Sequence, residues 1–328
     1  MLIAVHGLCL RCDGPNEKAK VSNLFFSHNQ KAVFLKFWII LSSSTVPFSW
    51  KQANVCAVHK KDDKSCANNY RPISLLCCVE KVFERLIFKR LFSFLQENNV
   101  LTSFQSGFIP GDSSVNQLTF LYNVFCKALD DGLEVRSVFF DISKAFDRVW
   151  HKGLLHKLKS AGVSGELLLW FKNYLTDRQQ RVVLPGASSQ WKVLSYGVPQ
   201  WSILGPLLFL IFINDIVSDI GSNISLFADD TSMYLVVEKY PNIAAATLLS
   251  DIDKVSNWAD KWHVDCNPSK SKCLLISRKT SVNPHPSLYM NGVQVSHASD
   301  HKHLGLLLSG NGTWQSHIEY MKAKAWKE

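Results

Sequence analysis

Two adjacent carboxylates, Asp229 and Asp230, are the residues of this chain best placed to do chemistry. They lie between short apolar runs at residues 224–227 and 233–237, a pattern that predicts strand, tight turn and strand with both acids at the turn. Adjacent carboxylates repel each other, so a fold keeps them together for a reason. The commonest reason is a divalent cation, and a third carboxylate nearby would favour phosphoryl or nucleotidyl transfer.

Asp141 is the candidate third carboxylate, because it follows an apolar run, residues 138–140, that predicts a buried strand. In a two-metal site, acids from separate elements converge so that one metal activates the attacking hydroxyl and the other stabilises the leaving oxygen. Asp141 and the Asp229-Asp230 turn would meet this need if their strands were neighbours, which spacing alone does not establish. On the residues alone, a loop of solvated acids is an equally good interpretation, since Asp readily forms turns.

The elements around these acids predict an α+β fold, in which helices pack on one face of a mostly antiparallel sheet. Helical periodicity covers residues 80–95, 115–129, 146–158, 204–216 and 248–262. Asp112, Ser113 or Ser114 is expected to cap the second of these helices, and Gly162 to stop the third. Pro185-Gly186, between two short apolar runs, predicts a hairpin.

Composition narrows the class of protein. The 328 residues allow one large domain or two medium ones, and 47% hydrophobic residues suffice for a full core. The net charge of +9 favours a polyanionic partner, nucleic acid first, although many basic proteins bind none. Nine irregularly spaced cysteines argue against a disulfide framework and for a reducing, intracellular setting.

Two apolar stretches, residues 32–41 and 204–213, are too short to cross a bilayer, and the first ten residues lack the features of a signal peptide. We therefore expect an intracellular protein, in the cytoplasm or the nucleus, with no membrane association. The sequence contains neither the GxSxG motif of serine hydrolases nor the P-loop motif of NTPases. Its eleven histidines show no metal-ligand spacing.

Seven segments, in order, resemble the reverse transcriptase domain of non-LTR (LINE-type) retrotransposons. They are residues 69–76 (NYRPISLL), 105–111 (QSGFIPG), 139–147 (FFDISKAFD), 197–209 (GVPQWSILGPLLF), 227–230 (FADD), 267–271 (NPSKS) and 303–305 (HLG). The resemblance implies the fingers and palm of a right-hand polymerase, with an antiparallel palm sheet backed by helices. It assigns residues 34–130 to a fingers-like region and 131–300 to a palm-like region, with part of the fingers inserted at about 148–195. Residues 301–328 would form the primer grip and the start of a truncated thumb, and residues 1–33 stay unassigned.

The resemblance also implies an activity, RNA-directed DNA synthesis. Asp141, Asp229 and Asp230 would bind two Mg²⁺ ions, with Mn²⁺ as an alternative, and dNTPs would be joined to the 3′-OH of a DNA primer on an RNA template. Lys270 would be the general acid near the pyrophosphate, although Lys272 lies close by.

Further roles follow for residues that contact nucleotide or template. Phe146 would exclude a ribose 2′-OH, but plain helix packing also explains this side chain. Arg71 would contact the triphosphate or template, or form a surface salt bridge, and Gln200 would touch the nucleotide or template. Lys60 and Lys61 would line a basic channel that follows phosphates, although a charge run such as this one is also typical of a solvated loop.

One departure from the family pattern concerns Trp201, which stands where the family has glycine. A side chain there would obstruct the approach of backbone to the incoming base pair, so we expect strongly reduced or absent polymerisation. This favours an alternative hypothesis: a catalytically impaired remnant that keeps the fold and binds nucleic acid weakly. A third hypothesis is an RNA-dependent RNA polymerase or a maturase-like palm. Phe146 and the FADD motif argue against it.

Overall fold

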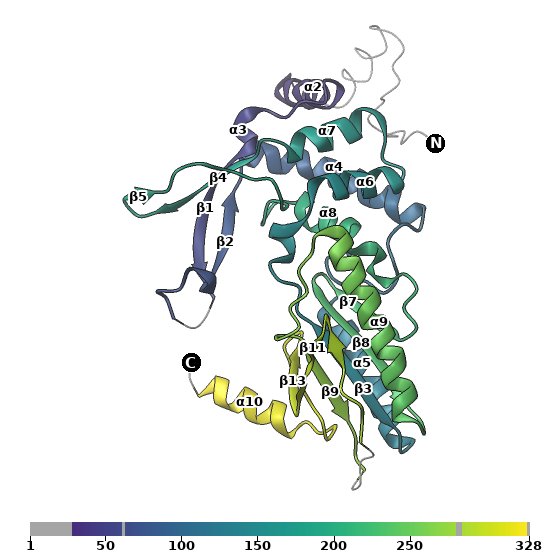
Figure 1. Cartoon of the computed structure of the whole chain (residues 1–328). Helices are drawn as coiled ribbons and strands as arrows, with labels where there is room; N and C mark the ends of the chain where they lie inside the picture. The colour runs from purple at the N-terminus through teal and green to yellow at the C-terminus, as the bar shows by residue number, and fades with distance from the viewer. Residues whose placement is uncertain (1–27, 61–62, 280–283, 327–328) are drawn as a thin grey trace. The chain divides into compact units, whose positions relative to one another are not determined.

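The structure is a computed structural model that describes residues 28–60, 63–279 and 284–326 (Figure 1). The chain divides into two compact units, and each unit combines two separate stretches of sequence. Unit 1 comprises Met1–Val100 and Phe146–Phe212, and unit 2 comprises Leu101–Ala145 and Ile213–Glu328. Both units contain helices and mainly antiparallel strands, which confirms the predicted α+β class.

Unit 2 is built on a five-stranded sheet in the order β12-β9-β3-β8-β7. These strands are β3 (Glu134–Phe140), β7 (Asn223–Phe227), β8 (Asp230–Val237), β9 (Lys272–Ile276) and β12 (Ser296–Ala298). Neighbouring strands run antiparallel except β12 and β9, which are parallel. Every residue of β3 is buried, since strands pair with it on both sides and side chains cover both of its faces. This burial explains why the sequence before Asp141 reads as a continuous apolar run and does not alternate.

Helices pack on this sheet, and β10–β11 and β13–β14 form two separate two-stranded sheets. The remaining elements of unit 2 are α5 (Ser114–Asp130), η3 (Asn214–Val217), α9 (Pro241–Trp262), β10 (Tyr289–Met290), β11 (Val293–Gln294), β13 (Asp300–His303), β14 (Leu306–Ser309) and α10 (Gln315–Ala325). The side chain of Ser113 accepts a hydrogen bond from the Asn116 backbone and caps α5, as predicted. Leu121 and Phe125 of α5 belong to one buried cluster with Phe139 of β3, and this cluster anchors the strand that leads to Asp141.

Unit 1 combines a second sheet with a helical layer. Its strands are β1 (Gln52–His59), β2 (Tyr70–Leu75), β4 (Gln179–Leu184), β5 (Ala187–Ser188) and β6 (Lys192–Val193). Its helices are α2 (His28–Ser42), α3 (Phe48–Lys51), η1 (Ala67–Asn69), α4 (Cys78–Glu97), η2 (Ala145–Arg148), α6 (His151–Ser160), α7 (Gly165–Leu175) and α8 (Leu204–Ile213), with η2 and α8 each reaching one residue across the unit boundary. The hairpin predicted at Pro185-Gly186 is present between β4 and β5.

The continuous helix predicted through Phe146 and Leu158 is wrong. The chain forms the short η2 first, and α6 begins only at His151. Between them the backbone is extended at Trp150, which forms a β-bridge with Tyr196, and Val149 accepts a hydrogen bond from the Gly197 backbone at 2.8 Å. These contacts with a distant segment use the backbone groups that a helix would need. The periodicity of the sequence carries no information about such long-range contacts.

Within the described ranges, no helix is both long enough and apolar enough to cross a membrane.

Candidate active site

Asp141 and Asp230 come together through the register of two paired strands. In β3 and β8, Phe139 pairs with Ser232 and Phe140 pairs with Thr231. The next position in this antiparallel register sets Asp141 opposite Asp230. The strands at the centre of the unit 2 sheet therefore bring the two carboxylates side by side, which spacing along the sequence could not establish.

Asp229 belongs to the tight turn that joins β7 to β8. Phe227 pairs with Asp230, so Ala228 and Asp229 form a two-residue loop. Ala228 has a φ of 56°, in the left-handed region that non-glycine residues rarely adopt. The predicted strand, turn and strand are confirmed, and the turn carries local strain of the kind that often marks functional sites.

The two other carboxylates act electrostatically on Asp230. Partial burial, followed by the negative charges of Asp229 and Asp141, raises the pKa of Asp230 to about 6. By its accessible surface Asp230 is exposed at the start of β8, so water screens part of this repulsion. Both neighbouring charges disfavour ionisation of Asp230, and a bound cation would offset this repulsion.

The segment that contains Lys270 lies beside Asp141. The Asp141 backbone donates to Ser271 Oγ at 3.2 Å, and the Asp141 carbonyl accepts from the Asn267 backbone at 2.9 Å. Ser271 is fully buried, whereas Lys270 is exposed. The turn at residues 267–271 is thus anchored next to Asp141, with Lys270 on its exposed side.

The chemistry of these donors fits Mg²⁺. Among the described residues, no group of three or more His, Cys, Asp or Glu side chains is arranged to enclose a metal ion. Mg²⁺ seldom needs such a cage, because it is usually held by one or two carboxylates, by waters and by substrate phosphates. Hard carboxylate oxygens that repel one another at a strand end are the donor set that this coordination requires.

Unit 1 contains a pocket of about 110 Å³ that brings Gln200 and Asp147 together. Gln200 Nε2 donates to Asp147 Oδ1 at 2.8 Å, and Pro72, Ser74 and Arg178 also line the pocket. Asp147 therefore orients Gln200. Sequence reasoning missed this contact, which segments 53 residues apart make only after folding.

Trp201 occupies a turn that requires left-handed backbone. The Ser202 backbone donates to the Pro199 carbonyl at 3.3 Å, and Trp201, the third residue of this turn, has a φ of 68°. A positive φ at the third position defines the type II turn, where glycine is favoured. Trp201 is 62% exposed, so its side chain gains little packing to offset the backbone cost.

The other predicted site residues of unit 1 lie on separate elements. Phe146 is half-buried and stacks on Phe209 of α8 with ring centroids 4.5 Å apart, so packing accounts for at least part of its role. Arg71 is exposed on β2, the edge strand of its sheet, and Lys60 is exposed at the end of β1. Lys61 lies outside the described residues.

A buried carboxylate, Glu84, holds the backbone directly after the turn that contains Gln200 and Trp201. Its Oε2 accepts from the Ile203 backbone at 2.7 Å, and its Oε1 accepts from the Tyr174 hydroxyl at 2.5 Å. Ile203 directly precedes α8, so Glu84 caps that helix from α4. Burial raises the pKa of Glu84, and its hydrogen bonds oppose that rise.

Sequence reasoning missed Glu84, although a signal was present. Glu80 and Glu84 share one face of α4 with Phe83, Ile87 and Leu91, and charged residues within an apolar stripe are buried with partners. Glu80 lies 3.5 Å from Arg178, which also donates to the Trp50 carbonyl at 3.1 Å. Burial, opposed by the Arg178 charge, raises the pKa of Glu80 to about 7.

Replacing Glu84 by alanine is expected to lower the free energy of unfolding by about 3–5 kcal/mol. The change leaves the Tyr174 hydroxyl and the Ile203 amide buried without their acceptor. Urea unfolding measures the loss, and alanine at the exposed Glu166 of α7 is the matched control, with an effect below about 0.5 kcal/mol. Equal stability of the two variants would contradict the capping role of Glu84.

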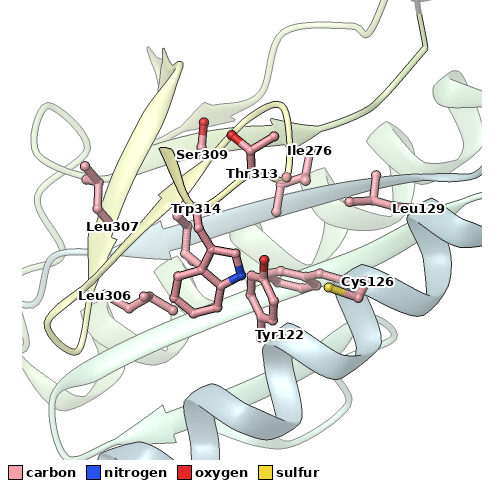
Figure 2. Close-up of a pocket in the computed structure, with 12 residues that line it drawn as sticks. Tyr122, Cys126, Leu129, Ile276, Leu306, Leu307, Ser309, Thr313 and Trp314 are labelled. Atoms are coloured by element: carbon pink, nitrogen blue, oxygen red, sulfur yellow. The ribbon is translucent and has the colours of Figure 1, made fainter. Parts of the chain in front are cut away.

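A second pocket lies in unit 2, between α5 and the β13–β14 hairpin (Figure 2). Its volume is about 10 Å³, which is room for about one water molecule. The Trp314 and Tyr122 rings pack against each other here with centroids 4.7 Å apart. The space is a packing gap beneath the hairpin and is too small for a substrate.

The chain is similar in sequence to proteins of one family. Residues 58–321 match the family model described as reverse transcriptase (RNA-dependent DNA polymerase). The RNA-directed DNA polymerase from the mobile element jockey of Drosophila melanogaster is 34% identical over 295 residues, covering 87% of this chain and 32% of the relative. The probable RNA-directed DNA polymerase from transposon X-element of the same organism is 33% identical, covering 89% of this chain and 32% of the relative. The chain thus spans about a third of the length of these curated relatives.

Solved structures show a similar fold. Apo telomerase from Candida tropicalis, truncated from its C-terminal domain, matches with a TM-score of 0.53 and 13% identity, covering 85% of this chain and 59% of that chain. At this level of identity, the likeness concerns the fold alone.

Proposed function

Because the chain belongs to the reverse transcriptase (RNA-dependent DNA polymerase) family and represents the reverse transcriptase domain of a LINE-type retrotransposon, we propose that its carboxylates catalyse RNA-directed DNA synthesis. The observation that supports this best is the strand register that sets Asp141 opposite Asp230, next to the turn that contains Asp229. The raised pKa of Asp230 agrees with this arrangement, because the negative charges of Asp229 and Asp141 add to the effect of burial.

The three carboxylates would hold two Mg²⁺ ions, or Mn²⁺ in their place. When bound, such ions stabilise negative charge on the attacking and leaving oxygens of phosphoryl transfer. Asp141 and Asp230 would orient the primer 3′-OH and the α-phosphate of a dNTP from adjacent strand ends. Lys270, exposed on a turn anchored beside Asp141, would donate a proton towards the departing pyrophosphate.

The residues of unit 1 would bind nucleotide and template. Gln200, held by Asp147 in its pocket, would contact the incoming nucleotide or the template base. The Phe146 ring would discriminate against a ribose 2′-OH. Arg71, on the edge strand β2, and Lys60, after the end of β1, would contact phosphates, and the same role is proposed for Lys61.

The two units would serve as parts of a right-hand polymerase. Unit 2 has the antiparallel sheet expected of a palm, and unit 1 combines β1, β2 and the β4 hairpin in the manner expected of fingers. The proposed partners are an RNA template, a DNA primer and dNTPs. We propose that the domain acts inside the cell, in the cytoplasm or the nucleus, where these partners occur.

The test is single-nucleotide primer extension on a primed RNA, supplied with either dNTP or NTP. It is best done in the Trp201→Gly chain, because Trp201 is expected to slow extension. A chain with valine at Phe146 should incorporate NTP about tenfold more readily relative to dNTP, since a smaller side chain admits the 2′-OH. Failure to incorporate any nucleotide opposite RNA would contradict the proposed function. An unchanged preference for dNTP over NTP would mean that Phe146 serves only in packing.

A second candidate function is an impaired remnant that keeps the fold and binds nucleic acid weakly. The left-handed, exposed Trp201 favours this reading. Binding assays cannot separate the two candidates, because phosphate contacts give salt-dependent binding in both. Primer extension separates them, since the remnant would bind primed RNA without extending it.

A further inference from the structure

A short segment of chain, residues 104–106, covers the edge of the unit 2 sheet next to the carboxylate turn. β7 is the last strand in the unit 2 sheet, and residues 104–106 lie along its outer edge. The Leu226 backbone donates to the Phe104 carbonyl at 2.9 Å, and the Ser106 backbone donates to the Leu226 carbonyl at 3.0 Å. Gln105 and Leu226 form a parallel β-bridge, so this segment holds β7 just before the turn.

The Gln105 side chain extends from this segment to the turn itself. It is 6% exposed, and its Oε1 accepts from the Ala228 backbone at 2.9 Å and from the Gly107 backbone at 2.7 Å. Both partners are N–H donors, so the oxygen of the amide must face them. Both lone pairs of the amide oxygen are therefore used to hold backbone.

Gly107 allows this close approach. A Cβ at Gly107 would lie 2.2 Å from the Ala228 nitrogen and 2.7 Å from the Phe227 carbonyl carbon. Both atoms belong to the backbone of the turn and cannot move aside cheaply. Only glycine therefore lets the segment lie against the turn.

Ala228 needs such support because of its backbone conformation. Its φ of 56° is unfavourable for an L-residue, and such conformations persist only where the surroundings impose them. The Ala228 N–H is buried at a turn, where the strand ladder offers it no acceptor. Gln105 supplies that acceptor.

We propose that Gln105 is a positioning residue that fixes Ala228 in its left-handed conformation and thereby sets Asp229 and Asp230 against Asp141. This role rests on the proposed function of the three carboxylates. It acts through the backbone of the turn, without contact between Gln105 and substrate.

The first test follows hydrogen exchange in peptides that cover residues 224–232 of the full chain. In the unmodified chain, the Ala228 amide should exchange as slowly as the amides of β7 and β8. Gln105→Met, which keeps the volume and removes the acceptor, should raise exchange at Ala228 about tenfold or more and leave the strand amides protected. Fast exchange at Ala228 in the unmodified chain would overturn the proposal, even if the variant did not fold.

The second test measures Mn²⁺ affinity by the electron paramagnetic resonance of the free ion. The carboxylate site is defined as the binding lost in Asp229→Ala. Gln105→Met should weaken this binding about 10- to 100-fold, the usual effect of removing a residue that orients ligands. Undiminished affinity in a folded Gln105→Met chain would contradict the positioning role.

Gln117→Met is the matched control for both measurements. Gln117 is an equally buried glutamine of unit 2, on α5, and its side-chain atoms make no hydrogen bond within the described residues. It should leave Ala228 exchange and Mn²⁺ affinity unchanged. If Gln117→Met and Gln105→Met lowered Mn²⁺ affinity and Ala228 protection equally, the effect of Gln105→Met would reflect general core stability, and the positioning role would be contradicted. A chain that binds no Mn²⁺ at all would refute the metal proposal, whereas the exchange data would still test the contact between Gln105 and Ala228.

Discussion

Replacing Trp201 by glycine is expected to raise primer extension by about a hundredfold. The turn at Pro199–Ser202 requires a positive φ at its third residue, and glycine adopts this conformation without cost. The change also removes a large exposed ring directly beside Gln200, which we propose contacts nucleotide or template. A displacement of reacting groups by about 1 Å costs about a hundredfold in rate, so relief on this scale is reasonable.

Two further variants separate the ring from the backbone conformation. Trp201→Ala removes the ring and keeps the left-handed cost, so it should recover extension if the ring is the obstruction. Trp191→Gly changes another exposed tryptophan of unit 1 and should leave extension unchanged. Trp201→Gly should also raise the free energy of unfolding by about 1 kcal/mol, measured in urea. Equal, robust extension by the unmodified and Trp201→Gly chains would refute the impairment.

Replacing Asp229 by alanine in the Trp201→Gly chain is expected to lower extension by about a thousandfold or more. The carboxylates would position the cations that stabilise developing charge, a contribution of several kcal/mol, and each 1.4 kcal/mol corresponds to a factor of ten in rate. Single-turnover incorporation of one dNTP on primed RNA measures the loss.

Asp253→Ala is the control for this change. Asp253 is an exposed carboxylate on α9, in the same unit and away from the turn. Its removal alters net charge by the same amount, so it reports any general effect on nucleic-acid binding. Comparable losses in both variants would mean that charge, and not the position of Asp229, carries the effect.

The carboxylate turn could be predicted from sequence because its signals are local. Alternation of apolar and polar residues and the turn preference of Asp both act over a few residues. The proximity of Asp141 to Asp230 could not be predicted in the same way, because it depends on which strands pair and in which register. Only the resemblance of ordered motifs suggested it, and the family match now supports that resemblance.

The contacts that hold the site were harder to predict because they are made between distant segments. Glu84 lies on the apolar face of α4, which indicates burial, yet its acceptor role depends on the distant Ile203 and Tyr174. Gln105 lay in a recognised motif, but nothing local connects its side chain with Ala228. The helix expected through Trp150 was wrong for the same reason, since the bridge to Tyr196 competes with helical hydrogen bonding.

Trp201 shows how structure can sharpen an interpretation without replacing it. From sequence, its glycine counterpart was explained by close approach of backbone to the base pair. The structure adds a second reason, because the φ of 68° disfavours any side chain at this position. The two reasons predict different behaviour of the Trp201→Ala chain, which makes them separable.

The most direct test of the proposed chemistry is single-nucleotide incorporation on four primed RNAs that differ only in the next template base. The Trp201→Gly chain should add the complementary dNTP in each case with Mg²⁺ present, and the same chain with Asp229→Ala should add none at a measurable rate. Equal incorporation by the two chains, or incorporation that ignores the template base, would contradict the assignment of Asp141, Asp229 and Asp230 as the site of RNA-directed DNA synthesis.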